Sequence, residues 1–532
     1  MIATTLLLTC AQLTGLQIPA AAIGLPTHGA AVTSAETVAA SGTAPKLAGE
    51  YCLVNAKIAP VDPAAPVILF RVALPVKWNA KALMFGGGGF NGSIPNITGD
   101  VPNGPSDQPN PLGRGYATFA SDSGHQANAL ASQDGSFALN EEAANNFGGD
   151  AIKKTHDAAL FVIRAHYGAG KLRKSYFAGG STGGRESIAA ITRWPKDWDG
   201  AIAWYPAWND VAALLQGQRI SRAMAQPGAY PNAAKRALLF NAAVAACDEL
   251  DGAKDGLISN QSACNARFDP AVLRCPEGGE GGDTCLSDAQ LVALKVMNTE
   301  ARFNFPLASG ETHYPGTNVW GADLGMATNT SQLQTIVTFL ALGWSAPAKP
   351  MPRTAPYIGP LLDQWMKFSV ARDANFDSLS LDPENPGPFG PRISELSVRL
   401  DTPVDLKAFA SKGGKLLMAH GVNDILVSTR ATQEYYQRLQ AQMGAPAVHR
   451  FARYYEVPGF GHGVSTVFNA SWDSLTALEN WAEKGAEPKA PVVLDTVGVP
   501  GRTRPLCDYP QWPKYSGKGD VNLAASFTCA AP

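Results

Sequence analysis

The stretch KSYFAGGSTGGRESIAAITRW, residues 174–194, leads from a short apolar run through four glycines around Ser181 into a helical pattern. Residues 179–183 fit G-x-S-x-G, the motif of a nucleophile elbow, in which a serine takes a strained backbone conformation at a strand-to-helix turn. Glycines two residues to either side remove Cβ atoms that would clash, and the helix N-terminus favours negative charge developing near the serine. An ordinary glycine-rich turn is the alternative, because the chain holds 53 glycines. The strand before and the helix after favour a nucleophile at Ser181.

Short apolar runs on both sides of this stretch end in glycine or polar residues, as strands of a parallel sheet do. Helical patterns separate them, and the clearest, residues 149–168, repeats apolar residues near a period of 3.6. Strands that alternate with helices predict a doubly wound, mostly parallel α/β sheet. The expected strands are 67–75, 82–85, 115–121, 174–178, 200–207, 415–421 and 450–459.

The alternation stops between about residues 209 and 400 and resumes at Lys415. An inserted lid domain explains the interruption, so the chain is expected to consist of a first core segment 1–208, a lid 209–400 and a second core segment 401–532. The region holds many aromatic residues, including Trp320, Phe339, Trp344, Trp365 and Phe368. Aromatic side chains of the lid are expected to stack on a substrate ring, without an assignment to individual residues.

Composition and charge indicate an ordinary globular protein. Of the 532 residues, 45% are hydrophobic and 17% charged, and the formal net charge is −2. Without a basic tract or a long acidic run, the chain offers no attraction to nucleic acid or to an anionic membrane, so a small or neutral ligand is expected. No window reaches 18 uninterrupted apolar residues, which argues against a membrane span.

The eight cysteines indicate the compartment. They include no CxxC pair and no zinc-ligand spacing to a histidine, which makes a zinc site a weak alternative. Their clustering favours local disulfides, which are typical of secreted or periplasmic proteins. Buried free thiols in a cytosolic protein are the other alternative. The first 24 residues lack a positive n-region and carry Gln12 and Gln17, so they fit a signal peptide poorly.

A serine hydroxyl needs a base and an orienting carboxylate to become a nucleophile. In an α/β-hydrolase these follow the serine in the order acid, then histidine. His462 lies in the loop PGFGHG after a predicted strand, and Asp424 lies just beyond the end of another, KLLMAHG. The sequence therefore predicts a triad of Ser181, Asp424 and His462.

The other candidates fit less well. His420 and His449 lie within or at the start of apolar runs and are expected to be structural, and Glu456 lies inside its own predicted strand. Asp122 and His125 precede the serine, so we expect them to form a loop or to line a pocket.

An oxyanion hole needs two backbone N–H groups directed at the developing negative charge. Thr182, which follows the serine, is expected to supply one, and the loop FGGGGFNG, residues 85–92, the other. Gly88 and Gly89 are the expected donors. A phosphate-binding loop is the alternative, which the missing Lys-Ser/Thr disfavours.

The stretch CDELDGAKDGLISNQSAC, residues 247–264, places Asp248, Asp251 and Asp255 between two cysteines. Carboxylates at this spacing, near glycine turns that expose carbonyls, suit an oxygen-seeking cation such as Ca²⁺, although they do not form the EF-hand pattern. A solvated acidic turn is an equal alternative.

Taken together, GGSTGGRE, CDELDGAKDGLISN with the later CLSDAQ, FGGGGFNG and GFGHG resemble the tannase and feruloyl esterase family, which also contains mono(hydroxyethyl)terephthalate hydrolases. The similarity runs from about Cys10 to Cys529. It implies an α/β-hydrolase core with a large lid, no organic cofactor, hydrolysis of esters of aromatic acids, and Ser181, Asp424 and His462 as the triad.

The resemblance also implies a calcium site in the lid. Its ligands would be Asp248, Asp251 and Asp255, with the carbonyls of Ala253 and Leu257. The family's disulfide pattern implies four pairs, which would place Cys10 outside any cleaved signal peptide. They are Cys10 with Cys52, Cys247 with Cys264, Cys275 with Cys285, and Cys507 with Cys529.

One departure from the family pattern concerns the predicted triad. Members typically carry a cysteine before the serine and another after the histidine, joined as a disulfide, whereas here these positions are Gly180 and Gly463. Both halves are missing together, so no unpaired thiol is left.

The sequence thus predicts a serine esterase that acts through an acyl-enzyme on esters of phenolic or other aromatic acids. Three alternatives stay open: a hydrolase of terephthalate monoesters or other small esters, a non-catalytic calcium-stabilised binding protein, and a peptidase.

Overall fold

The computed structural model describes residues 7–326 and 331–532. The chain forms two compact units, each built from three segments. Unit 1 comprises Met1–Ala203, Asp405–Leu417 and Asp473–Glu487, and unit 2 comprises Trp204–Val404, Met418–Trp472 and Pro488–Pro532. The expected lid, 209–400, lies within unit 2, which also holds most of the expected second core segment. The first six residues of the apolar N-terminal stretch lie outside the described part.

Unit 1 is organised around a large mixed sheet. Its strands follow the order β1-β2-β3-β4-β6-β5-β7-β8, continued by the first residues of β11. The bounds are β1 Gln17–Ile18, β2 Ala30–Val38, β3 Tyr51–Ile58, β4 Ile68–Pro75, β5 Lys81–Phe85, β6 Ala117–Ser121, β7 Lys174–Gly180, β8 Gly200–Trp204 and β11 Lys415–Gly421.

Strand direction changes within this sheet. The pairs from β1 to β4 and the pair β4–β6 are antiparallel, whereas β5 pairs in parallel with β6 and β7. The predicted parallel part is therefore present, but the N-terminal strands make the sheet mixed. The central strands β6 and β8 are buried along their whole length, which explains their continuous apolar sequence.

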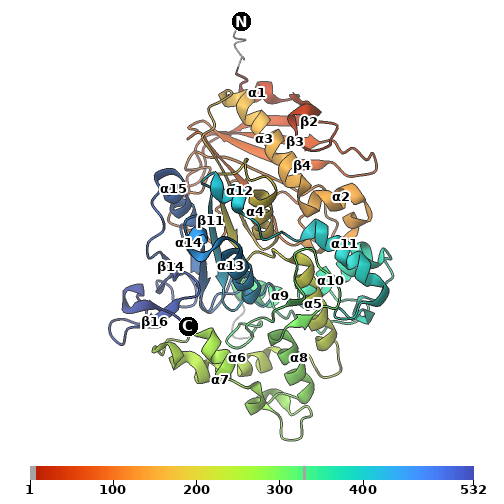
Figure 1. Cartoon of the computed structure of the whole chain (residues 1–532), viewed down its shortest axis with the longest axis vertical. Coiled ribbons are helices and arrows are strands. Elements are labelled where there is room, and N and C mark those ends of the chain that lie inside the picture. Colours follow the sequence, from red (N-terminus) through yellow and green to blue (C-terminus); the bar gives the residue numbers. More distant parts are fainter. Residues whose placement is uncertain (1–6, 327–330) are drawn as a thin grey trace. The chain divides into compact units, whose positions relative to one another are not determined.

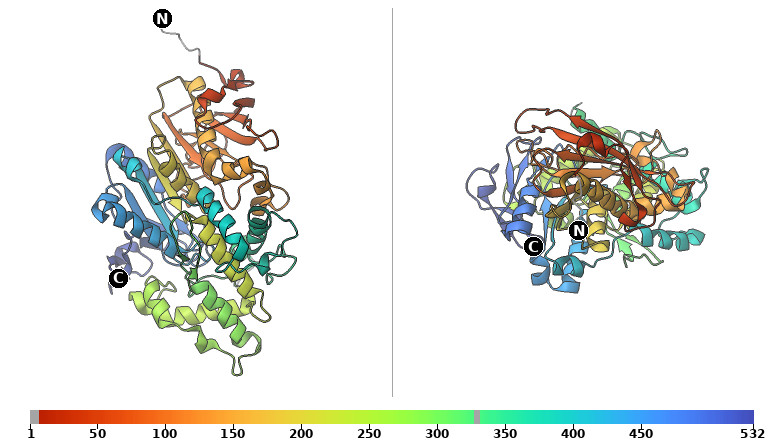
Figure 2. Two further views of the ribbon diagram at one scale, coloured as in Figure 1. Left: turned by 45° about the vertical axis from the view of Figure 1, so that its right-hand side comes forward. Right: turned by 90° about the horizontal axis from the view of Figure 1, so that it is seen from above.

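Helices cover the sheet of unit 1 (Figures 1 and 2). Helix α3, Ala151–Tyr167, packs against β3, β4 and β6, and α4, Thr182–Arg193, packs against β7. Helix α15, Ser474–Lys484, buries Leu478 and Trp481, and its Glu483 accepts a hydrogen bond from the buried Tyr176 of β7. The predicted helix at 149–168 is thus confirmed within two residues at its start and one at its end.

Unit 2 contains the C-terminal end of β11, strand β12 and many helices (Figure 1). Cys247, Cys264, Trp320 and other buried residues form one apolar core in this unit. Three small antiparallel sheets, β9-β10, β13-β14-β15 and β16-β17, complete it, with β9 at Ala301–Arg302 and β10 at His313–Tyr314. The bounds are β12 Ala452–Val457, α5 Asp210–Met224, α6 Ala233–Cys247, α7 Gln261–Arg267, α8 Asp288–Asn298, α9 Gln332–Leu340, α10 Ile358–Trp365, α11 Gly390–Leu400, α13 Thr429–Met443, β13 Ala470–Ser471, β14 Val492–Asp495, β15 Thr503–Pro505, β16 Trp512–Tyr515 and β17 Phe527–Ala530.

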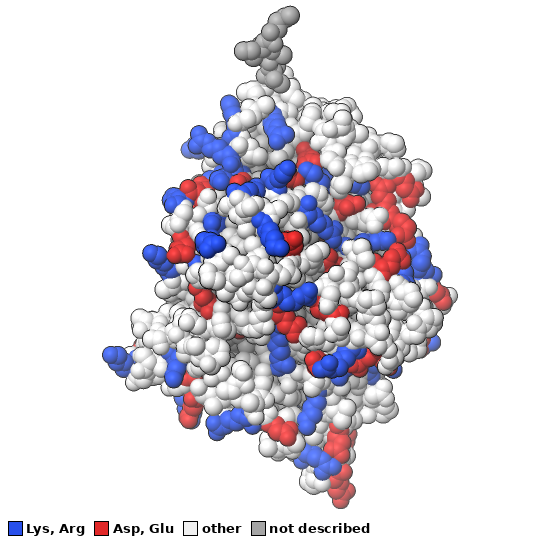
Figure 3. Space-filling view, in the orientation of Figure 1, with Lys and Arg blue, Asp and Glu red and all other residues white. Residues whose placement is uncertain are grey.

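All eight cysteines form disulfides, and the four bonds join the same pairs that the family resemblance implies. No helix in the described ranges is both long and apolar enough to cross a bilayer. On the face shown in Figure 3, acidic and basic side chains are interspersed and separated by wide uncharged areas.

Candidate active site

Ser181 lies in unit 1 at the junction of β7 and α4, with φ 60° and ψ −125°. An L-residue reaches this backbone region only under strain, of about 1–3 kcal/mol. A Cβ at Gly179 would lie 2.2 Å from the carbonyl oxygen of Gly183, and a Cβ at Gly183 would lie 2.7 Å from that of Gly87. Both outer glycines of the motif are therefore required by the close approach of backbone to backbone.

The glycine loop that follows β5 lies against the start of α4. The Gly183 amide donates to the carbonyl of Gly87 at 2.9 Å, and the Thr182 hydroxyl donates to the carbonyl of Gly89 at 2.7 Å. Unit 1 thus brings together the two segments that the sequence assigns to an oxyanion hole.

Most amides of this loop already have acceptors. Gly86 donates to Ala178, Gly87 to Glu186 and Phe90 to Ser132. Within residues 7–326 and 331–532, by contrast, the backbone N–H groups of Thr182, Gly88 and Gly89 have no acceptor. These are the three amides that the sequence analysis selects as donors.

Asp424 and His462 lie in unit 2 and form a close pair. The Nδ1 atom of His462 is 2.7 Å from Oδ2 of Asp424, and the Asp424 side chain is fully buried. The other carboxylate oxygen accepts the amides of Leu426 and Val427, each at 2.9 Å. Burial opposes ionisation, but the charge of His462 and hydrogen bonds from His420 and His462 hold the pKa of Asp424 below its usual range.

A second histidine, His420, contacts the same carboxylate. This contact was not predicted from the sequence. Nε2 of the buried His420 lies 3.2 Å from Oδ2 of Asp424 and 3.1 Å from the Val427 carbonyl, and Nδ1 lies 2.9 Å from the Thr432 hydroxyl. Because both partners of Nε2 are acceptors, that nitrogen carries the proton. His420 therefore helps to keep Asp424 ionised. The only sequence signal for this contact is its spacing of four residues from Asp424.

The loops that carry the pair meet backbone to backbone. The amide of Asn423 donates to Phe460, and the Asn423 side chain accepts the amide of Gly459 at 3.2 Å. A Cβ at Gly421 would lie 2.3 Å from the Phe460 carbonyl oxygen. This fit fixes the ends of β11 and β12 together and sets the Asp424–His462 distance.

Tyr205 packs beside His462, with ring centroids 4.8 Å apart. Its own φ is 35°, and its amide donates to the Ala419 carbonyl at 2.8 Å. A Cβ at Gly463, where φ is 74°, would lie 3.0 Å from the Tyr205 hydroxyl oxygen. Tyr205 thus fills the space in which a side chain at position 463 would begin.

Glu456, the competing acid of the sequence analysis, has other partners. On β12 its Oε1 accepts from Gln433 Nε2 at 2.7 Å and from the Tyr454 hydroxyl at 2.8 Å. Burial raises its pKa to about 7, against the lowering effect of these two donors.

Replacing Glu456 by glutamine is expected to remove a pH-dependent loss of stability. Because the pKa of Glu456 is higher in the folded chain than its value of about 4.3 in the unfolded one, the folded state holds the proton more tightly. Stability therefore falls as the pH rises from about 4 to about 7. Glutamine keeps both hydrogen bonds and does not titrate. Since the side chain is partly accessible to solvent, which weakens the effect, we expect the variant to gain about 1 kcal/mol over the wild type between pH 5 and 8.5 in urea unfolding. Parallel pH profiles would contradict this assignment.

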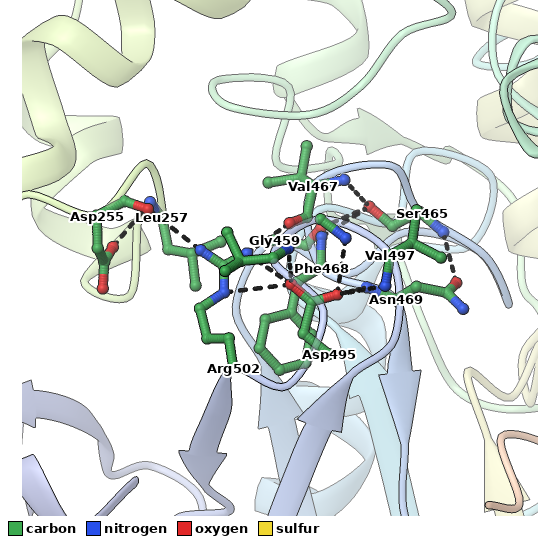
Figure 4. A network of polar contacts seen from close by, with 12 residues as sticks. Asp255, Leu257, Gly459, Ser465, Val467, Phe468, Asn469, Asp495, Val497 and Arg502 are labelled. Carbon is green, nitrogen blue, oxygen red and sulfur yellow. Dashed lines mark hydrogen bonds and ion pairs between the residues drawn. The ribbon is translucent and has the colours of Figure 1, made fainter. Parts of the chain in front are cut away.

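The acidic loop, residues 248–257, contacts the loop that carries His462. A Cβ at Gly459 would lie 2.6 Å from the Leu257 side chain, which packs there. Figure 4 shows Arg502 between the two loops, donating to the carbonyls of Asp255 at 3.1 Å and Val467 at 2.6 Å. Asp495 holds Arg502 by a buried ion pair of 2.8 Å.

The acidic loop offers oxygen atoms that suit a hard cation. Oδ2 of Asp251 is buried without a donor, and no described residue donates to the carbonyls of Ala253 and Leu257. Burial raises the pKa of Asp251 to about 6, against the lowering effect of Ser259 and the Ala253 amide, and neighbouring Asp255 and Asp248 add to the rise. Asp255 forms an ion pair with the buried Arg504. The residues present therefore fit a calcium ion. The Asp255 carboxylate would then contact both the ion and Arg504.

A tighter group of metal-binding residue types occurs in unit 1. His156, Asp157 and Asp197 are, in the described part of the chain, the one such group whose ligand atoms all lie within 4.8 Å of one another. Lys153 already lies 2.8 Å from carboxylate oxygens of both Asp157 and Asp197. Its ammonium group supplies the cation there. The carboxylates of the acidic loop are spread more widely, so a cation in that loop depends on the backbone carbonyls as well.

A hollow beside His462 is lined by residues of unit 2 alone. Asp323 contributes a carboxylate, which accepts the amides of Gly325 and Met326. None of the described lining residues is Lys or Arg, but the buried Arg236 interacts electrostatically with Asp323 from outside the lining. The other lining residues are Val337, Leu340, Ala341, Asn423, Ile425, Gly459, Gly461, Val464 and Ser465.

The aromatic residues of the expected lid differ in their burial. Trp320 and Trp365 are buried in unit 2 and expose no ring face, whereas Trp344 is 52% exposed and stacks near Phe339. In unit 1, the buried Asp122 and His125 lie beside the glycine loop. The Gly92 amide donates to the Asp122 carbonyl, and the His125 ring stacks on Phe137 at 3.8 Å.

Known proteins have sequences and structures similar to those of this chain. The model of the tannase and feruloyl esterase family matches residues 52–530. An uncharacterized esterase of Agrobacterium fabrum is 39% identical over 98% of this chain and 93% of its own length. The mono(2-hydroxyethyl) terephthalate hydrolase of Piscinibacter sakaiensis is 32% identical over 94% and 89%.

Solved structures show the same fold. The crystal structure of feruloyl esterase B from Aspergillus oryzae matches with a TM-score of 0.75 at 21% identity, covering 96% of this chain and 98% of that one. The predicted α/β-hydrolase fold is thereby confirmed. Since a family match over most of the length agrees with relatives above 30% identity, the chain belongs to the tannase and feruloyl esterase family and is a carboxylic ester hydrolase.

Proposed function

We propose that this esterase cleaves esters of phenolic and other aromatic acids through an acyl-enzyme on Ser181, with His462 as the base and Asp424 as its partner. The hydrogen bond of 2.7 Å between Asp424 and Nδ1 of His462 carries the proposal. A buried carboxylate at this distance keeps the imidazole proton on Nδ1, so the lone pair is on Nε2 and can accept a proton from a serine hydroxyl. The strained backbone of Ser181 supports its role as nucleophile.

In the proposed reaction, Ser181 Oγ attacks the ester carbonyl carbon as its proton moves to His462 Nε2. The carbonyl oxygen becomes an oxyanion, which the amides of Thr182 and of Gly88 or Gly89 stabilise. The C–O bond then breaks, and the alcohol leaves with the proton from His462. Water, deprotonated by His462, attacks the acyl-enzyme, and the acid leaves as Ser181 regains its proton.

The charge beside His462 supports a neutral acyl group. Asp323 lines the adjoining hollow, and the buried Arg236 interacts with it from outside the lining. A substrate carboxylate in direct contact with the Asp323 carboxylate would be repelled. Terephthalate monoesters carry such a carboxylate, whereas ferulate and gallate esters carry neutral phenols. A terephthalate monoester hydrolase stays the second candidate because a relative with that activity is 32% identical.

A panel of esters tests the substrate class. We expect kcat/KM for methyl ferulate or methyl gallate to exceed that for mono(2-hydroxyethyl) terephthalate by at least about 10-fold, the order of effect of one unfavourable charge contact. p-Nitrophenyl acetate serves as the control for general esterase activity. A preference for the terephthalate monoester would favour the second candidate, and no turnover of any ester, with no labelling of Ser181 by a fluorophosphonate, would contradict the enzyme mechanism.

We also propose a structural Ca²⁺ held by Asp248, Asp251 and Asp255 with the carbonyls of Ala253 and Leu257. The donor-free oxygens of the acidic loop support it. When bound, the ion supplies positive charge that neutralises the carboxylates and ties the loop together. The four disulfides further support a secreted or periplasmic location.

A further inference from the structure

Glu186 is a buried carboxylate five residues after Ser181 on α4, and the proposed reaction does not use it. Its side chain is 5% exposed. One oxygen accepts the Gly87 amide at 3.0 Å and the other accepts Nδ2 of Asn91 at 2.7 Å. It therefore binds both ends of the segment that contains Gly88 and Gly89.

The chemistry of these contacts calls for an acceptor with two oxygens. The loop presents two N–H donors from opposite ends, and an ionised carboxylate accepts on both oxygens without offering a donor of its own. Burial raises the pKa of Glu186, whereas the positive charge of the neighbouring Arg185 and the donors Gly87 and Asn91 oppose that rise and favour the ionised form. Arg185 also donates to the Phe147 carbonyl at 3.0 Å, and the Phe147 ring packs against that of Phe90 at the end of the loop.

Close contacts with the start of α4 and with Asn91 explain the first two glycines of the loop. A Cβ at Gly86 would lie 2.6 Å from Cα of Gly183 and 2.8 Å from Oε2 of Glu186, and one at Gly87 would lie 2.2 Å from Oδ1 of Asn91. A Cβ at Gly88 would meet nothing within 4 Å. Gly86 and Gly87 thus allow the carboxylate contact, and the two glycines that follow keep the uncommitted amides.

We propose that Glu186 is a positioning residue that, with Asn91 and the Thr182 hydroxyl, fixes the glycine loop so that the Gly88 and Gly89 amides stabilise the oxyanion. Glu186 binds the loop at Gly87 and Asn91, and Thr182 holds the Gly89 carbonyl between them. The role rests on the proposed function, because it serves the oxyanion hole of that same site. Because the loop amides bind the oxyanion, Glu186 is expected to affect stabilisation of the transition state and not binding of the substrate.

Glu186→Leu tests the role. The variant leaves the Gly87 amide and Asn91 without an acceptor. We expect kcat for methyl ferulate to fall about 30- to 300-fold with KM within about twofold, because a displaced oxyanion donor is felt only in the transition state. The inhibition constant of an aryl trifluoromethyl ketone, which forms a tetrahedral oxyanion on serine, should rise by a similar factor. Glu186→Gln keeps one oxygen for Gly87 and can pair with a turned Asn91 amide, so it should retain kcat within about threefold.

A matched control is Glu142→Leu. Glu142 is another carboxylate of unit 1 that accepts two loop amides, those of Val61 and Asp62, away from the glycine loop. The Glu142→Leu variant should keep kcat within about twofold of the wild-type value. Should Glu186→Leu fail to fold, Thr182→Val carries the test, since it keeps the backbone amide and removes only the bond to Gly89. We expect that variant to lose about 5- to 20-fold in kcat at unchanged KM.

Hydrogen exchange of residues 85–92 separates this proposal from the proposed function, because it needs no substrate. Exchange that is faster in Glu186→Leu than in wild type and in Glu142→Leu supports the contact between Glu186 and the loop. If no ester is hydrolysed by the wild type, that result rejects the proposed function but leaves this support for the contact intact. An active wild type whose Glu186→Leu and Thr182→Val variants keep kcat within twofold would overturn the positioning role. The positioning role would also be overturned if a rise in KM accounted for the whole loss of kcat/KM in Glu186→Leu. Unchanged hydrogen exchange of residues 85–92 in that variant would overturn it as well.

Discussion

Ser181→Ala is expected to lower kcat/KM for aromatic esters by about 10⁴- to 10⁶-fold, the loss that follows removal of a serine nucleophile from a triad. The variant should also resist labelling by a fluorophosphonate, since the labelled atom is the missing Oγ. Kinetics on methyl ferulate and mass spectrometry of the labelled protein measure the two effects. The loss should exceed that of any other single substitution considered for unit 1.

Ser181→Gly sharpens this experiment. Glycine adopts the backbone conformation of Ser181, with φ 60° and ψ −125°, without the steric conflict of a Cβ. Both variants should be inactive, but Ser181→Gly should be more stable than Ser181→Ala by about 1–3 kcal/mol, the strain stored at such a position. Ser187→Ala is the control, because its hydroxyl bonds only the Gly183 and Ile202 carbonyls. A Ser181→Ala protein that keeps its activity would refute Ser181 as nucleophile.

Removal of calcium is expected to have the largest effect on stability. At a free Ca²⁺ concentration about 100 times the dissociation constant, a site that exists only in the folded state contributes about 2.7 kcal/mol. A chelator should therefore lower the melting temperature of the wild type. It should also slow ester hydrolysis, because Leu257 packs on Gly459 and Arg502 joins Asp255 to the His462 loop.

Two variants make the calcium test specific. Asp251→Ala removes the buried carboxylate whose Oδ2 lacks a donor, so the chelator should no longer change its melting temperature. In chelator, this variant should be at least as stable as the wild type, because it no longer buries an uncompensated charge. Glu249→Ala alters the same loop at a side chain that is 72% exposed and pairs, among the described residues, with Lys254 alone, so it should keep the full response. A wild type that melts at one temperature with and without chelator has no such site.

The parallel core was predictable because its strands are buried on both faces. The expected strand 415–421 has the bounds of β11, and β5, β7 and β8 begin within one residue of their predictions. β2 was not predicted, because its sequence AAVTSAETV is largely exposed and lacks an apolar run. Its place in the sheet depends on antiparallel pairing with β3, a tertiary contact that periodicity does not encode.

The candidate site was predictable where chemistry requires particular residue types. Close backbone approach requires Gly179 and Gly183, and a base needs a carboxylate such as Asp424. The supporting residues were not predictable, since Glu186, His420 and Tyr205 act through partners that only the fold brings close. The burial of Trp320 and Trp365 was not predictable either. The sequence of the lid does not distinguish an aromatic ring that packs in the core from one that lies at the surface. The roles of the triad, the oxyanion amides and the calcium ligands stay predictions.

The position of Tyr205 makes two sites of the chain evolutionarily interdependent. A cysteine at position 463, as the resemblance implies for other family members, meets both a φ of 74° and the Tyr205 hydroxyl. Conversely, a small residue at position 205 leaves a void beside His462 unless position 463 carries a larger side chain. A mutational path between the two types of chain therefore has to change both positions nearly together. Substitution statistics across the family should show this epistasis as covariation between an aromatic residue at 205 and glycine at 463.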